Sequence, residues 1–418
     1  MRDGNPASKK APAVNPRTTN QGIEKAWRLL GIALVAALAT VVAASGQNNG
    51  GQNKGSQLTE VWRLADPAVY ENISVFPVVA RKSAETTGFE TLDEALLSGE
   101  ALVTERGSDI LRRTRDGQPM HENVPMSERM PQSGASVNEL VLVNRGKKPL
   151  ILLAGEMVSG GKQDRIIAKD RIVPVGAEPL PLDVFCVEHG RWTTGSGFTA
   201  AMTMVHPSVR EQAAVDQEQT KVWDAVRVGS TSRSITMDGG GAGGGGSNGA
   251  PAAAPVISGR ALETMAATIA PTGDYQKLYN NSKVNQDVNP FVDELQRRFA
   301  RTTENLKGER VIGVVIAYGG EIAWSDIFAS PELFERYWPK LLRSYVVEAL
   351  ARPRTKEQAT MAEAQDFLKP LRGPEKVEST PDVYRWREVT QGHYAEIELQ
   401  ALKPEDMLLH QMKIHRTS

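Results

Sequence analysis

Cysteine is almost absent from this chain, since Cys186 is the only one among 418 residues. No disulfide can form within the chain, so packing of apolar side chains has to hold the fold together. A single cysteine within an apolar strand is most often a small buried hydrophobe, and we expect that role here. His189, three residues along the same strand, faces the opposite side and cannot form a direct Cys-His pair. Only a histidine from elsewhere could activate the thiol, and the candidates are His206, His393 and His410.

An excess of charge of either sign is also missing. The chain has 49 Lys and Arg residues against 50 Asp and Glu residues, a formal net charge of −1, and its basic residues are scattered. Nucleic-acid-binding proteins concentrate positive charge, so we expect no nucleic-acid partner. The chain also lacks a close-set pair of histidines on one helix face, the most recognisable metal signature, and we predict no metal site and name no cofactor.

Long hydrophobic runs are limited to one, Leu29 to Ala44, which follows a basic leader. The run is marginal for a membrane span, which needs about 20 residues, and it ends in small residues that suit signal peptidase. We predict a cleaved export signal over residues 1–45, with a retained signal-anchor and a buried core helix as alternatives. The first two place the folded part outside the cytoplasmic membrane: periplasmic, extracellular or anchored to its outer face. No cysteine stands directly after the run, which excludes a lipid anchor at that position.

Two stretches contain too little apolar surface to fold by themselves. Residues 46–57 are rich in Gly, Asn and Gln and predict a flexible tether. Residues 230–255 include GGGAGGGGSNGAPAAAP, which cannot offset the entropy lost on folding. We therefore predict one domain over residues 58–414, interrupted by a disordered Gly-rich insertion.

Apolar, β-branched runs predict strands in the first half of the chain. These runs span residues 73–82, 136–144, 149–158, 165–175 and 182–188. The second and third flank Arg145-Gly146-Lys147-Lys148 and predict a hairpin. A short helix is expected over 91–97, ended by Gly99.

Helical signals dominate the middle of the chain, and strands return toward its end. We expect helices over 208–226, 259–270 and 356–368, the first with a capping box at Ser208. Two further helices are expected to begin at proline, one at Pro290 after Asn289 and one at Pro331 after Ser330. Pro339 should kink or divide the helix that begins at Pro331. Strands are expected over 310–317 and 321–328 around a Tyr-Gly-Gly turn, and over 393–399 and 407–414. This order predicts an α+β fold with mainly antiparallel sheet.

The stretch from Ala154 to Trp192 places polar residues at the ends of apolar strands. Gly160 and Gly161 allow backbone N–H groups to point inward, and nearby Lys and Arg side chains add positive charge. We predict that this polar cluster binds a small phosphate- or carboxylate-bearing ligand. Its residues are Glu156, Lys162, Gln163, Arg165, Glu188, His189 and Arg191. The alternative to an anion-binding turn at Gly160 and Gly161 is a plain hairpin turn with solvated charges. The alternative to ligand binding as the function of the protein is a non-catalytic domain that binds an envelope protein.

Glu156 and Glu188 could form an acid-base pair if neighbouring strands bring them together. With Asp164 or Asp170 they could instead bind a hard metal ion. The structural alternative is ion pairing with Arg165 and Arg191, including at least one bidentate pair. In the second half, Trp324 and Trp338 are expected in the core, with Asp326 capping or anchoring the next helix.

Five features together resemble a bacterial family: GGKQDR, the strand ending VFCVEHGRW, the Trp223 helix, YGG followed by WSDIF, and the helix LFERYWPKLLRSYVVEA. The family is the ARG and rhodanese-phosphatase superfamily associated protein domain, a domain of unknown function. The resemblance covers about residues 72–414 and implies one domain on both sides of the Gly-rich segment. It also implies a genomic association with ADP-ribosylglycohydrolase and rhodanese-phosphatase proteins. It brings no settled catalytic residues, so we transfer none and assign no reaction.

Overall fold

The computed structural model describes residues 62–106, 139–188, 195, 197–228, 275–352 and 355–416. The export signal, the tether, the Gly-rich segment and the helix expected over 259–270 lie outside these residues. None of the helices in the described ranges is long and apolar enough to cross a membrane. Antiparallel strands and packed helices make up the described part, which confirms the α+β prediction.

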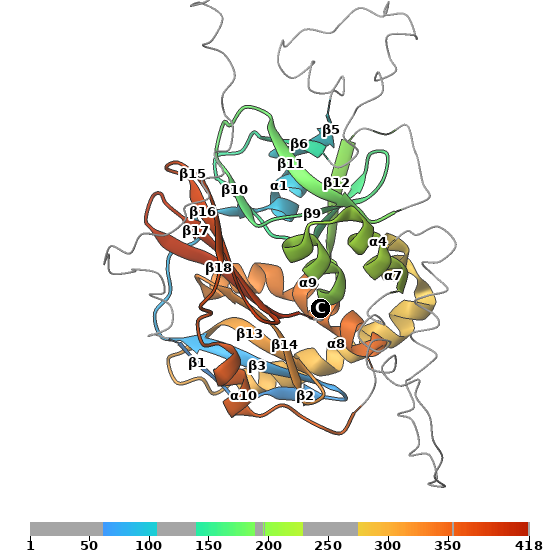
Figure 1. Ribbon diagram of the computed structural model, residues 1–418, viewed down its shortest axis with the longest axis vertical. Coiled ribbons are helices and arrows are strands. Elements are labelled where there is room, and N and C mark those ends of the chain that lie inside the picture. Colours follow the sequence, from blue (N-terminus) through green and yellow to red (C-terminus); the bar gives the residue numbers. More distant parts are fainter. Residues whose placement is uncertain are drawn as a thin grey trace, which may run out of the picture. The chain divides into compact units, whose positions relative to one another are not determined.

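The larger sheet is antiparallel and takes strands from both ends of the chain (Figure 1). In spatial order its strands are β1 (Trp62–Leu64), β3 (Ile73–Ala80), β13 (Arg310–Tyr318), β14 (Glu321–Phe328), β18 (Met407–His415), β17 (Tyr394–Ala401), β16 (Tyr384–Gln391) and β15 (Glu375–Thr380), with β2 (Ala68–Tyr70) also paired to β3. Strand β3 pairs with β13 from Ile73↔Tyr318 to Ala80↔Arg310. The segments on the two sides of residues 229–274 therefore share one sheet.

A closed barrel forms the second β-structure. Its strands are β5 (Ala101–Glu105), β6 (Glu139–Asn144), β8 (Glu156–Gly160), β9 (Arg165–Ile167), β11 (Leu180–Cys186) and β12 (Gly197–Met204). All six contribute to one apolar cluster, for example through Val103, Val158 and Val184. A small sheet of β4 (Glu90–Thr91), β7 (Leu150–Leu152) and β10 (Arg171–Val173) completes the strands of this part.

Helices cover both faces of the larger sheet. The helical elements of the described residues are α1 (Leu92–Ser98), α3 (Pro207–Glu211), the π-turn η2 (Gln212–Asp216), α4 (Gln219–Val228), α7 (Gln276–Asn280), α8 (Ser282–Thr303), α9 (Pro331–Ala351) and α10 (Met361–Phe367). Helix α1 packs on the barrel and the small sheet instead of the larger sheet. Helices α8 and α9 pack on the face that carries Val314, and α10 packs on the face that carries Val315. Helix α9 also contacts the small sheet, because the Tyr337 hydroxyl donates a 3.0 Å hydrogen bond to the Ile151 carbonyl.

Three local signals form the predicted structures. Helix α1 begins with a complete capping box between Thr91 and Glu94 and ends at Gly99, whose φ of 78° favours glycine. The Ser330 hydroxyl caps α9 by accepting a hydrogen bond from the Leu333 amide. Strands β13 and β14 pair as the predicted hairpin.

Pairing predictions between residues 136 and 175 were wrong. Strand β6 lies in the barrel between β5 and β11, whereas β7 pairs with β10 and β4 in the small sheet. The predicted strand 165–175 is divided into β9 and β10, with Asp170 between them. All these strands are apolar on both faces, so their local pattern fits several partners, and non-local packing selects one.

Three helix predictions also needed correction. The Ser208 hydroxyl does not cap a helix, because it donates to Glu348 at 2.7 Å, and the helix expected over 208–226 is interrupted at η2 and Gln217. Helix α8 begins earlier than predicted, capped by Asn281, so Pro290 lies inside it. Pro339 does not divide α9, which runs unbroken to Ala351.

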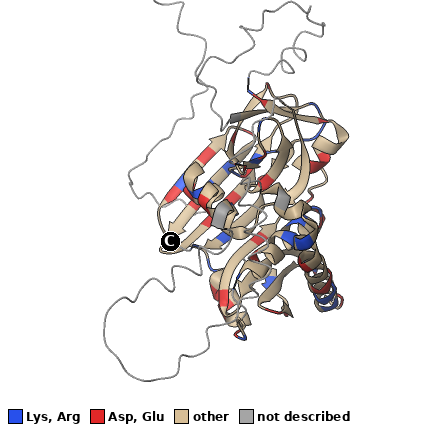
Figure 2. Cartoon of the chain, turned by 90° about the vertical axis from the view of Figure 1, so that its right-hand side faces the viewer, with Lys and Arg blue, Asp and Glu red and all other residues tan. Residues whose placement is uncertain are grey.

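Strands β15 and β16 were missed because their sequences are rich in charged and polar residues. Strand β15, EKVEST, is the edge of the larger sheet and is mostly exposed, so it needs little apolar pattern. Figure 2 shows basic and acidic residues interspersed over the strands and helices, in keeping with the small net charge.

Candidate functional site

The predicted Gly-Gly turn connects β8 to β9 at one end of the barrel. Val158 pairs with Arg165, which makes the two strands an antiparallel hairpin. Gly160 and Gly161 have φ angles of 128° and 54°, and a Cβ atom at Gly161 would collide with the Phe198 ring. Glycine is therefore required here by both conformation and close approach.

Backbone amides of this turn are already bonded to carboxylates of the protein. Asp164 accepts from the Gly160 amide at 2.9 Å, and Glu105 accepts from the Lys162 amide at 3.0 Å. Glu188 accepts from the amide of Asp164 at 3.3 Å. These contacts occupy the donors that an anion-binding loop would present, so any anion bound here has to be held mainly by side chains.

Arg165 is the most unusual side chain of the predicted cluster, because its guanidinium is fully buried. The Nη1 atom donates to the Gln163 side-chain oxygen at 3.4 Å and to the Asp164 carbonyl at 3.3 Å. The Nη2 atom lies 3.8 Å from Glu105, beyond hydrogen-bond distance. Within the described ranges, Nε and Nη2 have no hydrogen-bond partner. Two charged donors thus stand desolvated at this end of the barrel.

Strand alternation places Arg165 and Cys186 on the barrel side of their strands. The two residues pair directly in β9 and β11, and their neighbours Ile167 and Val184 belong to the barrel cluster. Cys186 is 2% exposed, which confirms the prediction of a small buried hydrophobe. Burial raises the pKa of the Cys186 thiol although Arg165 acts in the opposite direction, so the thiol is protonated at neutral pH.

Glu156 lies at the other end of β8 and belongs to a different contact. Its carboxylate accepts hydrogen bonds from the Lys340 ammonium and from the Leu153 amide. Of the arginine-carboxylate pairs considered as the structural alternative, Glu156 therefore does not pair with Arg165, because a lysine from α9 takes that place. Lys340 also lies 2.6 Å from Asp93, so one buried ammonium neutralises two carboxylates. Burial acts to lower the pKa of Lys340, but Glu156 and Asp93 outweigh it and raise the pKa.

The structure thus brings Lys162, Gln163, Arg165 and Glu188 together at one barrel end and separates Glu156 from them. The predicted residues His189 and Arg191 lie outside the described part. The described residues contain no group of three or more His, Cys, Asp or Glu side chains placed to hold a metal ion.

Sequence reasoning missed a buried polar network around Asp326. Its carboxylate accepts hydrogen bonds from Arg210 at 2.8 Å, from the Trp324 indole at 2.8 Å and from the Tyr345 hydroxyl. Burial acts to raise the pKa of Asp326, but Arg210 and His410 outweigh it and hold the pKa at about 2. The Tyr345 contact anchors α9, as expected for Asp326, although Ser330 provides the cap.

His410 extends this network to the loop between β9 and β10. Its Nδ1 atom lies 2.6 Å from Asp170 and its Nε2 atom 2.9 Å from Asp326. Burial acts to lower the pKa of His410, but the two carboxylates outweigh it and raise the pKa. All three side chains are 0% exposed. The network therefore ties the barrel region to the larger sheet and is closed to solvent. The sequence analysis named Asp170, Asp326 and His410 separately, as candidates for a metal site, a helix cap or anchor, and thiol activation. It did not predict that they contact one another.

Comparison with known proteins gives one finding. The family model described as ARG and Rhodanese-Phosphatase-superfamily-associated Protein domain matches residues 62–417, which is most of the chain. No curated protein and no solved structure matches the chain.

Proposed function

Since the chain belongs to the ARG and Rhodanese-Phosphatase-superfamily-associated Protein domain family, whose name states an association and no reaction, we propose its function from the geometry. The protein binds a small phosphate- or carboxylate-bearing ligand at the barrel end formed by Lys162, Gln163, Arg165 and Glu188. His189 and Arg191, which follow β11 in the sequence, were predicted to contact the same ligand and lie outside the described residues. Glu156 does not, because Lys340 neutralises it elsewhere.

One observation carries this proposal: the Nε and Nη2 donors of Arg165 are buried without a hydrogen-bond partner in the described part. A desolvated charged donor that stays unpaired costs several kcal/mol, on the order of 2 to 5. A bidentate anion would satisfy both donors, since guanidinium geometry matches carboxylate and phosphate. Lys162, which is half-buried in the turn before β9, adds a second positive charge to this part of the chain.

Glu105 makes the proposal testable in both directions. Its carboxylate lies 3.8 Å from Arg165 Nη2 and would repel an incoming anion. Glu105→Gln keeps an oxygen for the Lys162 amide but removes the negative charge. We expect this variant to bind inorganic phosphate more tightly than the wild type. If Glu105 and Arg165 form only a structural pair, the variant loses stability and gains no affinity.

The experiment is a thermal-shift titration of the full chain with inorganic phosphate, against sodium chloride at matched ionic strength. We expect phosphate to raise the melting temperature of the wild type, with a smaller shift for Lys162→Gln and none for Arg165→Gln. Arg385→Gln, an exposed arginine of β16, is the matched control and should keep the full shift. Ligand-free stability provides a second readout, because removing an unpaired Arg165 should cost little. A wild type that does not respond to phosphate, or a large ligand-free loss in Arg165→Gln, contradicts the proposal.

A further inference from the structure

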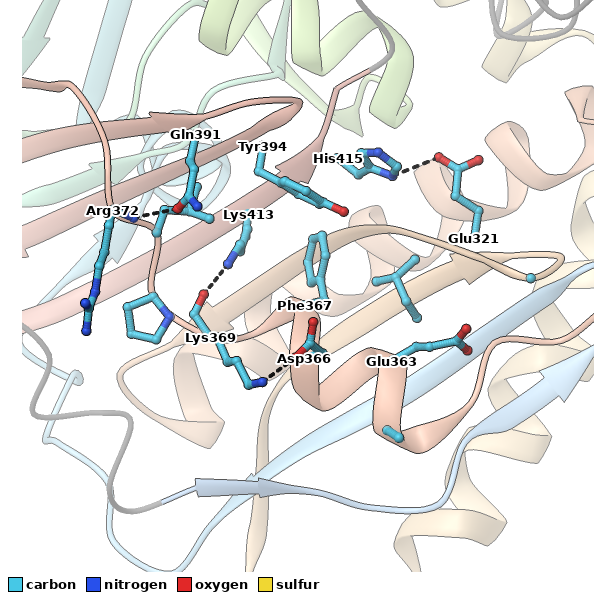
Figure 3. A pocket seen from close by; sticks show the side chains of 15 residues that line it. Glu321, Glu363, Asp366, Phe367, Lys369, Arg372, Gln391, Tyr394, Lys413 and His415 are labelled. Atoms are coloured by element: carbon cyan, nitrogen blue, oxygen red, sulfur yellow. Dashed lines mark hydrogen bonds and ion pairs between the residues drawn. The ribbon is translucent and has the colours of Figure 1, made fainter.

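A pocket lies on the larger sheet and is independent of the barrel end around Arg165. Its walls come from α10 and the chain after it and from the ends of β14, β17 and β18 (Figure 3). The cavity has a volume of about 850 Å³, within the range of small-molecule sites. None of the described residues of the predicted cluster lines it.

One wall of this pocket is a row of aromatic rings. Tyr394 and His415 pair across β17 and β18, and their rings stack with centroids 4.8 Å apart and planes 19° apart. Phe367 of α10 meets Tyr394 edge-on at 6.0 Å. Tyr394 is 36% exposed, which is high for a large aromatic side chain in a sheet. The open ring face offers a planar ligand offset stacking, the arrangement that aromatic pairs prefer.

The floor of the pocket carries a buried cation, Lys413, which is 3% exposed. Its ammonium donates to the Lys369 carbonyl and forms an ion pair with the buried Glu396 carboxylate, 3.7 Å away. An ammonium has three donors, so Lys413 retains capacity for another acceptor. Burial lowers the pKa of Lys413 and outweighs the Glu396 carboxylate, which acts to raise it.

Two other charged side chains around the pocket have charged partners, whereas Arg372, which also lines it, is hydrogen-bonded to Gln391 through its backbone amide. Lys369 pairs with Asp366, and His415 pairs with Glu321 at 3.1 Å. Figure 3 shows Lys413 between the Tyr394 ring and the chain after α10. An anionic group at Lys413 would therefore lie beside a ring that stacks on Tyr394.

We propose that this pocket binds a small molecule that combines a planar ring with a carboxylate or phosphate, the ring against Tyr394 and the anionic group at Lys413. Both the aromatic wall and the Lys413 ammonium are needed to recognise this class of ligand. The aromatic wall selects a flat apolar ring, and the buried ammonium selects negative charge and disfavours a neutral ring.

Three matched probes test the proposal by calorimetric titration of the full chain. They are 2-naphthoate, which is planar and anionic, decalin-2-carboxylate, which is anionic but not planar, and 2-naphthylmethanol, which is planar but uncharged. We expect 2-naphthoate to bind about tenfold more tightly than either of the others. No binding of 2-naphthoate, or equal binding of all three, overturns the proposal.

Variants locate the binding. Tyr394→Leu keeps an apolar side chain at an exposed position, and Lys413→Met removes the buried charge. Each should weaken 2-naphthoate binding about tenfold, whereas Arg385→Gln, outside the pocket, should leave it unchanged. Tyr394→Leu keeps the test decisive even if Lys413→Met fails to fold, because Tyr394 is not part of the core. Unchanged 2-naphthoate binding in Tyr394→Leu overturns the proposal. Inorganic phosphate, which lacks a ring, should not compete here, and this separates the pocket from the Arg165 site.

Discussion

The Nη1 atom of Arg210 lies 2.8 Å from the Oδ2 atom of Asp326, and both side chains are buried. Arg210 comes from α3 and Asp326 from β14, so this ion pair connects a helix beside the barrel with the larger sheet. His410 and Asp170 continue the connection. These polar side chains thus form a hydrogen-bonded network that is closed to solvent, although the Nη2 atom of Arg210 has no hydrogen-bond partner in the described part.

Asp326→Asn should destabilise the protein strongly. The substitution leaves Arg210 and His410 buried without their shared carboxylate, and breaking a buried pair costs about 3–5 kcal/mol. Asp366→Asn is the control, because Asp366 and its partner Lys369 are both exposed and the change should stay within about 0.5 kcal/mol. Urea unfolding measures both. A loss below about 1 kcal/mol for Asp326→Asn would show that the network does not hold the two parts together.

Stability should depend on pH through His410. Asp170 and Asp326 raise its folded pKa above the unfolded value of about 6.5, so its contribution is full below that pH and is lost as pH rises through the folded pKa. The difference in unfolding free energy between the wild type and His410→Gln should therefore shrink as pH rises above about 6.5. Arg385→Gln, at an exposed position and with no group that titrates in this range, serves as the control and should show no such trend. A pH-independent difference for His410→Gln would disprove this linkage.

Acid should weaken the same network through Asp326. Its folded pKa of about 2 is below the unfolded value of about 3.9, so its contribution is present above pH 3.9 and is lost as pH falls toward 2. Unfolding measured by circular dichroism between pH 5 and pH 2 should show a loss of stability that is smaller in Asp326→Asn. Equal acid sensitivity of the two proteins would assign the effect to other carboxylates.

Lys340 should be energetically coupled to Glu156. Lys340→Met leaves Asp93 and Glu156 without their shared cation and should cost about 3 kcal/mol. Glu156→Gln in the same chain should recover part of this loss, because one negative charge is gone and the Leu153 amide keeps an acceptor. A double-mutant cycle from denaturant unfolding measures the coupling. Additive losses would mean that the two residues act independently.

Deleting Gly239 to Gly249 should leave the melting temperature nearly unchanged. Strands β3 and β13 pair across this part of the sequence, so both sides should unfold together. Shortening a connection between paired strands changes its closure entropy only logarithmically. Calorimetry should show one transition before and after the deletion. Two independent transitions would disprove the prediction of one interrupted domain.

Fusing Met1 to Gln57 to a reporter should deliver the reporter across the cytoplasmic membrane. The basic leader and the apolar run that follows are the features on which export depends, and a mature product should begin near Ser45. N-terminal sequencing of the exported product checks the cleavage site. A full-length, membrane-retained product would support the signal-anchor alternative, and a cytoplasmic reporter would contradict export.

Short-range signals in the sequence determined several elements. The capping box at Thr91, the cap at Ser330 and the turn between β13 and β14 depend on residues within a few positions of each other. Their geometry needs no distant partner, so sequence patterns predicted the helix that starts near Thr91, the Ser330 cap and the hairpin, although the capping box at Thr91 itself was not predicted. The requirement for glycine at Gly161 was also visible, although the Phe198 ring that enforces it was not.

Only the tertiary structure decided strand partners and charge partners. Strands β6 and β7 are apolar on both faces, so either could pair with many others until the barrel closed. Glu156 contacts Lys340, which is 184 positions away in the sequence, and Arg210 contacts Asp326, which is 116 positions away. A carboxylate in the sequence carries the same charge whichever cation it meets, and burial next to one particular cation selects its partner. The composition therefore determined which charged side chains the fold contains, and tertiary packing determined which of them pair. Packing also left two donors of Arg165 without a hydrogen-bond partner in the described part.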